Sequence, residues 1–230
     1  MKPLVIAIDG PSGSGKSSTA RGVATRLGLA CLDTGSMYRA IALGAMAGGL
    51  MDDPEGIVGF TQRAQLTLGT DPANQSIALN GVDVTEDVHS PEVSAQVSKV
   101  ATIKAVRDIL TAQMRAIVKD RGRIVVEGRD ITTVVCPDAD VRVLLVADQA
   151  ARLARRDAQV GGLDSQDLRD QVVSRDEADA TVSVFLTPAT GVTLIDSTHM
   201  TLEQVIYAVV ELVASLTVEK IPCFGPFWSR

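Results

Sequence analysis

Short apolar runs alternate with amphipathic segments along most of the 230 residues of this chain. Five runs are rich in β-branched and other apolar residues; they span residues 4–8, 30–32, 123–127, 141–147 and 192–195. Such runs are typical of strands that are buried on both faces of a parallel sheet. Apolar residues at helical spacing follow four of the runs. These segments are residues 17–27, residues 37–46, the residues after the fourth run as far as 156, and residues 202–216. The alternation predicts an α/β fold with a parallel sheet.

Residues 64–88 break this rhythm, because apolar and polar positions alternate there one by one. Within this stretch Asn80-Gly81 separates two such runs, and Asn-Gly is the strongest short-range signal for a hairpin. We therefore predict a small antiparallel insert. A helix from about residue 90 to 118 is then expected to return the chain to the core.

Composition and charge exclude several classes of function. Hydrophobic residues make up 46% and charged residues 22%, which is a globular balance, and the net charge of -6 argues against a general nucleic-acid binder. Two histidines, and three cysteines without a C-x-x-C pair, argue against a zinc site or a disulfide framework. The longest apolar stretch, 41–51, is shorter than the roughly 20 residues of a membrane span, and no export signal stands out. We expect a cytoplasmic protein without nucleic-acid or membrane partners.

The stretch from Gly10 to Ser17 matches the phosphate-loop pattern G-x-x-x-x-G-K-[ST], and it lies between a predicted strand and a predicted helix. Glycines let successive backbone N–H groups turn toward phosphate oxygens, and the start of the helix adds its positive end. Lys16 is expected to reach the β- and γ-phosphates, and the Ser17 hydroxyl to be a Mg²⁺ ligand. The alternative is a chance glycine-rich turn. The predicted ATP-binding residues are Gly10, Pro11, Ser12, Gly13, Ser14, Gly15, Lys16, Ser17 and Ser18.

This motif indicates a nucleoside triphosphate and leaves the reaction open. One class is a kinase that transfers the γ-phosphoryl group to a small acceptor, and the other is a switch or motor that hydrolyses the nucleotide. Neither Asn74 nor Asn80 is followed by lysine, so the guanine-reading Asn-Lys-x-Asp of a GTPase switch is absent from the sequence. A kinase needs an acceptor pocket and arginines that neutralise charge during transfer.

Candidate side chains for such a pocket follow the predicted strands, where doubly wound sheets bind their ligands. Guanidinium groups suit phosphate oxygens, although each arginine has the alternative of a solvated surface charge. Glu127 and Asp33 end two of the strands; each either orients Mg²⁺ through water or is a structural acid. The remaining candidates are Arg39, Arg129, Asp130, Arg152, Arg155, Arg156, Arg175 and Asp179.

Taken together, these segments resemble the bacterial cytidylate kinases, a family of nucleoside monophosphate kinases. The resemblance rests on the phosphate loop and on the segments 32–39, 97–107, 127–135 and 196–198, of which Asp-Thr-Gly-x-x-Tyr-Arg and Gly-Arg-Asp-Ile-x-Thr-Val-Val are the most specific. It implies transfer of phosphate from ATP to CMP or dCMP by a monomer. It also implies one three-layer P-loop kinase domain over 1–230, with a five-stranded parallel sheet of order 2-3-1-4-5. Within that domain it implies a monophosphate-binding region at 34–108 that contains the insert at about 64–88, and a short lid at 150–176.

The resemblance also implies roles for individual residues. Cytosine would be read by Thr34, Arg107 and Asp130, because a carboxylate is the usual partner of the cytosine amine and would disfavour uracil. By the same resemblance Ser98, Arg175 and Asp179 would hold the sugar, and Arg39 and Arg129 would clamp the acceptor phosphate. The CMP-binding set implied by the family is Thr34, Tyr38, Arg39, Ser98, Arg107, Arg129, Asp130, Arg175 and Asp179. Arg152, Arg155 and Arg156 would be lid arginines that close over the triphosphate. The catalytic set implied by the family is Lys16, Arg39, Arg129, Arg152, Arg155 and Arg156. It needs no general base, because the attacking phosphate oxygen is already ionised.

The sequence departs from the family at Val182, where a further phosphate-binding arginine is expected. A lost charged contact of this kind costs about 10²-fold or more in rate unless a neighbouring arginine substitutes. Two alternatives therefore stay open beside cytidylate kinase. One is a kinase for another small acceptor, such as UMP or a sugar acid, and the other is a nucleotide-binding protein without catalysis.

Overall fold

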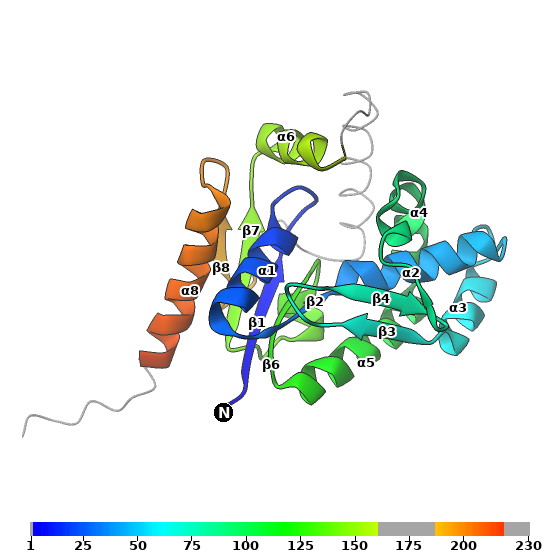
Figure 1. Cartoon of the computed structure of the whole chain (residues 1–230), viewed down its shortest axis with the longest axis horizontal. Helices are drawn as coiled ribbons and strands as arrows, with labels where there is room; N and C mark the ends of the chain where they lie inside the picture. Colours follow the sequence, from blue (N-terminus) through cyan, green and yellow to red (C-terminus); the bar gives the residue numbers. More distant parts are fainter. Residues whose placement is uncertain (1, 161–186, 219–230) are drawn as a thin grey trace, which may run out of the picture.

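A five-stranded parallel sheet forms the centre of the chain, whose structure is a computed structural model that describes residues 2–160 and 187–218 (Figure 1). Its strand order is β2-β6-β1-β7-β8, which confirms the predicted order 2-3-1-4-5. The strands coincide with the five apolar runs to within two residues at each end. They are β1 (Leu4–Asp9), β2 (Ala30–Asp33), β6 (Arg123–Gly128), β7 (Val141–Val146) and β8 (Thr193–Asp196). Arg175, Asp179, Val182 and the predicted lid beyond residue 160 lie outside the described residues.

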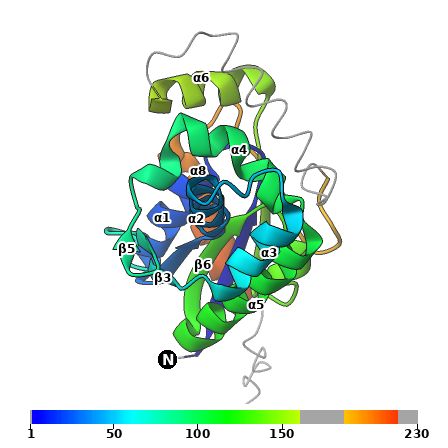
Figure 2. The same cartoon turned by 90° about the vertical axis from the view of Figure 1, so that its right-hand side faces the viewer.

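Helices cover both faces of this sheet, because every central strand carries apolar side chains on both sides (Figures 1 and 2). On one face Ile6 and Ile8 of β1 pack with α1 (Lys16–Leu27) and α8 (Leu202–Val218). On the other face Ala7 packs with residues of α2 (Thr34–Ala47) and α5 (Lys104–Arg121). The core is therefore two apolar layers separated by the sheet, as expected for buried parallel strands.

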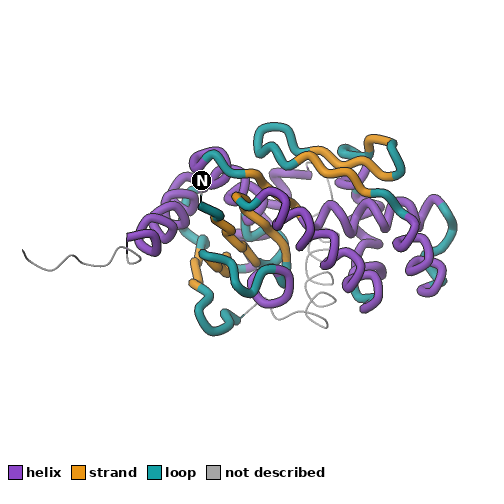
Figure 3. Tube along the Cα trace, turned by 90° about the horizontal axis from the view of Figure 1, so that it is seen from below, coloured by secondary structure: helices purple, strands orange, loops and turns teal. Residues whose placement is uncertain are grey.

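The predicted antiparallel insert is present as a separate sheet of order β3-β4-β5 (Figure 3). Its strands are β3 (Leu66–Gly69), β4 (Ser76–Leu79) and β5 (Val82–Asp83). Asn80 and Gly81 have φ values of 52° and 83°, which is the left-handed backbone that a two-residue hairpin turn requires. The sheet packs its apolar face on α2, where Ala40 is buried beside Ile77 and Leu79. A short 3₁₀ turn, Asp87–His89, follows it.

The single helix predicted for residues 90–118 was wrong, since the structure has two helices there, α4 (Pro91–Ala101) and α5. Thr102 donates its hydroxyl hydrogen to the Ser98 carbonyl at 2.9 Å, and Ile103 has an extended backbone with ψ of 112°. The apolar pattern continues across this break, so the pattern alone did not reveal it. The break has a consequence for the site, because it places Arg107 in the first turn of a new helix.

Two further helices complete the described part of the chain. Helix α3 (Pro54–Arg63) was not predicted, although its signal is present: Asp53 caps it by accepting from the Gly56 N–H at 2.9 Å, and Pro54 occupies the first turn. Helix α6 (Gln149–Val160) follows β7, as predicted. No helix of the described residues is long and apolar enough to cross a membrane.

Candidate active site

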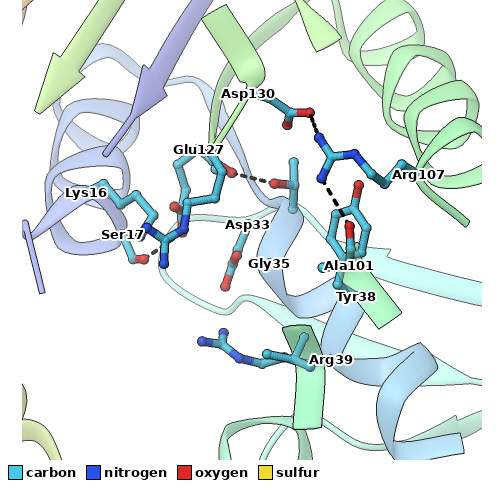
Figure 4. A pocket seen from close by; sticks show the side chains of 14 residues that line it. Lys16, Ser17, Asp33, Gly35, Tyr38, Arg39, Ala101, Arg107, Glu127 and Asp130 are labelled. Atoms are coloured by element: carbon cyan, nitrogen blue, oxygen red, sulfur yellow. Dashed lines mark hydrogen bonds and ion pairs between the residues drawn. The ribbon is translucent and has the colours of Figure 1, made fainter. Parts of the chain in front are cut away.

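The carboxyl ends of three adjacent strands, β2, β6 and β1, meet at one pocket (Figure 4). In the parallel register Asp33 is the partner of Glu127, and Asp9 is the partner of Gly128. The pocket lies where ligands of doubly wound sheets bind. Its lining residues are Lys16, Ser17, Asp33, Thr34, Gly35, Tyr38, Arg39, Val97, Ala101, Arg107, Glu127, Gly128, Arg129 and Asp130.

The predicted phosphate loop connects β1 to α1 and forms one end of this pocket. Gly13 has a φ of +77°, and a Cβ atom on it would lie 2.5 Å from the Arg152 carbonyl oxygen. Only glycine lets the loop take this conformation so close to α6. Gly15 is also left-handed and precedes the first turn of α1, which begins with Lys16 and Ser17. Both of these side chains therefore face the pocket beside the positive end of the helix.

Two carboxylates lie behind Ser17. The Ser17 hydroxyl donates to Glu127 Oε1 at 2.6 Å, and Glu127 is buried. Burial and the neighbouring charge of Asp33 raise the pKa of Glu127 to about 7. Burial also acts to raise the pKa of Asp33, but the charge of Arg39 and other nearby groups leave that pKa below its usual value. Asp33 has a structural role as well, because it caps α2 by accepting from the Ser36 N–H and hydroxyl at 3.2 and 2.7 Å.

The opposite end of the pocket contains an ion pair between Arg107 and Asp130. Arg107 also donates to the Ala101 carbonyl at 3.2 Å, across the break between α4 and α5 (Figure 4). The two side chains are only 16% and 9% exposed. This pairing fixes both groups beside Tyr38, which lines the same pocket from α2.

Thr34 lies between the two ends of the pocket, in the first turn of α2. Its hydroxyl donates to the Glu127 carbonyl at 2.8 Å, so its oxygen faces the pocket side with lone pairs to offer. The contact requires glycine at 128, because a Cβ atom there would lie 2.5 Å from Thr34 Oγ1 and 2.8 Å from Ile131 Cδ1.

The two arginines that were predicted to bind the acceptor phosphate both line the pocket. Arg39 extends from α2 on the Asp33 side (Figure 4). Arg129 follows β6, and its NH1 group donates to the Gly10 carbonyl at 3.4 Å. The structure thus brings guanidinium groups into the pocket from two different elements.

Two of the predicted lid arginines, Arg152 and Arg155 of α6, bond to the phosphate loop and do not line this pocket. Arg152 donates to the Ser12 carbonyl at 3.0 Å. Arg155 donates to the Ser14 carbonyl at 3.3 Å and to the Ser197 hydroxyl and carbonyl at 2.9 and 2.6 Å. Arg155 therefore joins α6 to the loop between β8 and α8. The side chain of Arg156 lies outside the described part.

Among the described residues that were predicted to bind CMP, only Ser98 does not line the pocket, and several lining residues were missed. Ser98 lies on α4 between Val97 and Ala101, which do line the pocket, but it does not line the pocket itself. The missed lining residues include Val97, Ala101 and Gly128. They lie within segments used for the resemblance, but only the structure shows that they line the pocket. Asp9, the last residue of β1, was missed as well.

A parallel sheet in this strand order, with a phosphate loop after its first strand and an arginine-rich pocket beside it, defines a P-loop kinase. The sequence pattern of the family described as "Cytidylate kinase" matches residues 6–215. The chain therefore belongs to the cytidylate kinase family.

Similar proteins agree with this assignment. A cytidylate kinase of Cutibacterium acnes is 58% identical over 214 residues, which cover 92% of this chain and 96% of the relative. A cytidylate kinase of Streptomyces griseus is 43% identical over 213 residues, which cover 91% of this chain and 92% of the relative. An uncharacterised protein of Eubacterium ventriosum has a similar fold, with a TM-score of 0.52 at 11% identity over 92% of this chain and 99% of that one.

Proposed function

We propose that this chain transfers the γ-phosphoryl group of ATP to CMP or dCMP, and that the residues described above carry out the transfer. The observation that supports this most directly is the Arg107–Asp130 pair in a pocket that continues to the phosphate loop. A carboxylate and a guanidinium held together there offer a cytosine ring an acceptor and a donor. ATP would occupy the phosphate loop, and the acceptor would occupy the pocket.

Selection of cytosine over uracil follows from the direction of the hydrogen bonds. The Thr34 hydroxyl already donates to the Glu127 carbonyl, so it offers the base a lone pair and no hydrogen. Asp130 is ionised beside Arg107 and can only accept. Both groups suit the exocyclic amine of cytosine, and both oppose the O4 oxygen of uracil.

The acceptor phosphate would lie between Arg39 and Arg129, with Lys16 on the donor phosphates. An attacking phosphate oxygen is ionised at pH 7, so these residues position and neutralise rather than abstract a proton. The roles predicted for Ser98, Arg175 and Asp179 at the sugar, and for the α6 arginines over the triphosphate, remain part of the proposal.

The residues around Ser17 fit a Mg²⁺ ion that enters with ATP. Mg²⁺ prefers oxygen ligands and keeps several waters, and this end of the pocket offers one hydroxyl and the two carboxylates of Asp33 and Glu127. When bound, the ion would neutralise charge on the β- and γ-phosphates. Ser17 would hold it, and the carboxylates would orient its waters.

A coupled ADP-release assay with ATP and Mg²⁺ tests the proposal, with CMP, dCMP, UMP and AMP as acceptors. We expect fast turnover with CMP and dCMP and little with UMP or AMP. The variant Arg129→Lys tests how the acceptor phosphate is bound, because it keeps the positive charge and loses the planar fork of the guanidinium. Retained ATP binding without turnover of any acceptor would contradict the proposal and favour a nucleotide-binding protein without catalysis.

A further inference from the structure

Asp9 connects two segments that are far apart in the sequence. It is the last residue of β1 and directly precedes the phosphate loop, yet it is only 2% exposed. Its Oδ1 accepts from the Ile131 N–H at 2.8 Å. Its Oδ2 accepts from the Thr132 N–H at 2.9 Å and from the Thr132 hydroxyl at 2.6 Å. One buried carboxylate thus takes up three donors from a segment more than 120 positions away.

The donors begin a π-helical turn, Ile131–Val135, that directly follows Arg129 and Asp130. Asp130 itself has φ of −142° and ψ of 27°, so the chain bends sharply between the pocket residues and the turn. The orientation of Arg129 and Asp130 therefore depends on where this turn starts. Asp9 fixes that start relative to the phosphate loop.

A second bond joins the same two segments in the opposite direction. Arg129 donates to the carbonyl of Gly10, the residue after Asp9. The far end of the turn is held separately, because Arg115 of α5 donates to the Val134 and Val135 carbonyls at 2.6 and 3.2 Å. The turn would therefore remain attached to the domain without Asp9, but its position relative to the phosphate loop would no longer be set.

We propose that Asp9 is a positioning residue that holds the acceptor-binding pair Arg129 and Asp130 in place relative to the phosphate loop. The inference rests on the proposed function, because it assigns ATP to one segment and the acceptor to the other. Transfer between two bound nucleotides needs their reacting atoms in close alignment, and a misplacement of about 1 Å costs on the order of 10²-fold in rate. A carboxylate is suited to this task because it accepts without donating and can take all three hydrogens at once.

The variant Asp9→Asn tests the proposal with almost no change in volume. Its amide oxygen can still accept from Ile131, but its amide hydrogens would face the Thr132 N–H. We expect kcat with CMP to fall by at least about tenfold, while the separate dissociation constants of ATP and CMP change by less than about threefold. An adenosine–cytidine pentaphosphate, which spans both sites, should bind at least about tenfold more weakly to the variant.

Three further variants separate positioning from stability. Thr132→Val removes one of the three hydrogen bonds to Asp9 and should lower kcat by a smaller factor than Asp9→Asn does. Thr132→Ser keeps the hydroxyl and should have the kcat of the unmodified protein. Arg115→Met loosens the far end of the same turn, so it should lower Tm with kcat within about twofold of the unmodified protein at a temperature well below Tm. If Asp9→Asn does not fold, the kcat values of Thr132→Val and Thr132→Ser, and the binding of the pentaphosphate to these two variants, decide the question.

Two results would overturn the inference while leaving the proposed function intact: Asp9→Asn with an unchanged kcat, or Arg115→Met with an equal loss of kcat for an equal loss of Tm. An unmodified protein that turns over no CMP and does not bind the pentaphosphate would overturn both.

Discussion

Arg107 and Asp130 form a largely buried ion pair although they lie 23 positions apart in the sequence, and the break between α4 and α5 brings them together. The pair combines residues of two elements that approach the pocket from different directions. Its placement leads to a prediction about acceptor specificity.

Asp130→Asn should reduce the preference for CMP over UMP by about tenfold or more, because an amide can donate to the uracil oxygen and a carboxylate cannot. The ratio of kcat/KM values for the two acceptors measures this, and it is independent of how much protein is folded. The same variant leaves the Arg107 guanidinium without the opposite charge of Asp130, and only its bond to the Ala101 carbonyl is unaffected, so Tm should fall as well. An unchanged ratio would mean that Asp130 does not read the base.

Gly128→Ala should weaken CMP binding with little effect on ATP. The added Cβ atom would crowd Thr34 Oγ1 and Ile131, and the Thr34 hydroxyl would lose its place against the Glu127 carbonyl. We expect KM for CMP to rise about tenfold, in line with the loss of one base contact. Gly59→Ala, on α3 and away from the pocket, is a suitable control for a glycine replaced in this chain. Equal effects on both substrates would point to a general disturbance instead.

The raised pKa of Glu127 predicts how pH affects the stability of the ligand-free protein. The folded pKa is about 7, against an ordinary value of 4.5, so the folded state holds a proton that the unfolded state releases. The stability that this group contributes is complete below about pH 4.5 and is lost as pH rises through 7. The Tm of the unmodified protein should therefore fall between pH 5.5 and 8 more steeply than the Tm of Glu127→Gln. Parallel curves for the two proteins would rule out Glu127 as the titrating group.

Arg155→Lys should mainly affect ATP. The guanidinium donates to Ser14 of the phosphate loop and twice to Ser197, which a single ammonium group cannot reproduce. We expect KM for ATP to rise about tenfold while KM for CMP stays within about twofold, as measured with the other substrate saturating. Arg26→Lys, whose side chain forms an exposed ion pair with Glu203, is the matched control and should leave both constants unchanged.

Much of the fold and part of the site could be predicted from the sequence, because their signals are local. The phosphate loop is contiguous, the apolar runs mark the strands, and Asn80-Gly81 marks the hairpin. The break at Thr102 and Ile103 could not be found in the same way, since the helical pattern continues through it. The hydrogen bonds between Asp9 and Thr132 could not be predicted either. Nothing in the sequence near Asp9 shows that this strand-ending acid bonds to a residue 123 positions away.

Helix α2 presents one face to the pocket, through Thr34 and Tyr38, and another to the antiparallel sheet of β3, β4 and β5, where Ala40 packs with Ile77 of β4. The sheet can consequently not be deleted without an effect on α2. Deletion of β3, β4 and β5 would expose to water the apolar face of α2 that now packs on the sheet. Polar substitutions on that face would be needed before the helix could be stable without the sheet. Engineering of a smaller enzyme from this chain would thus have to begin at the helix rather than at the hairpin.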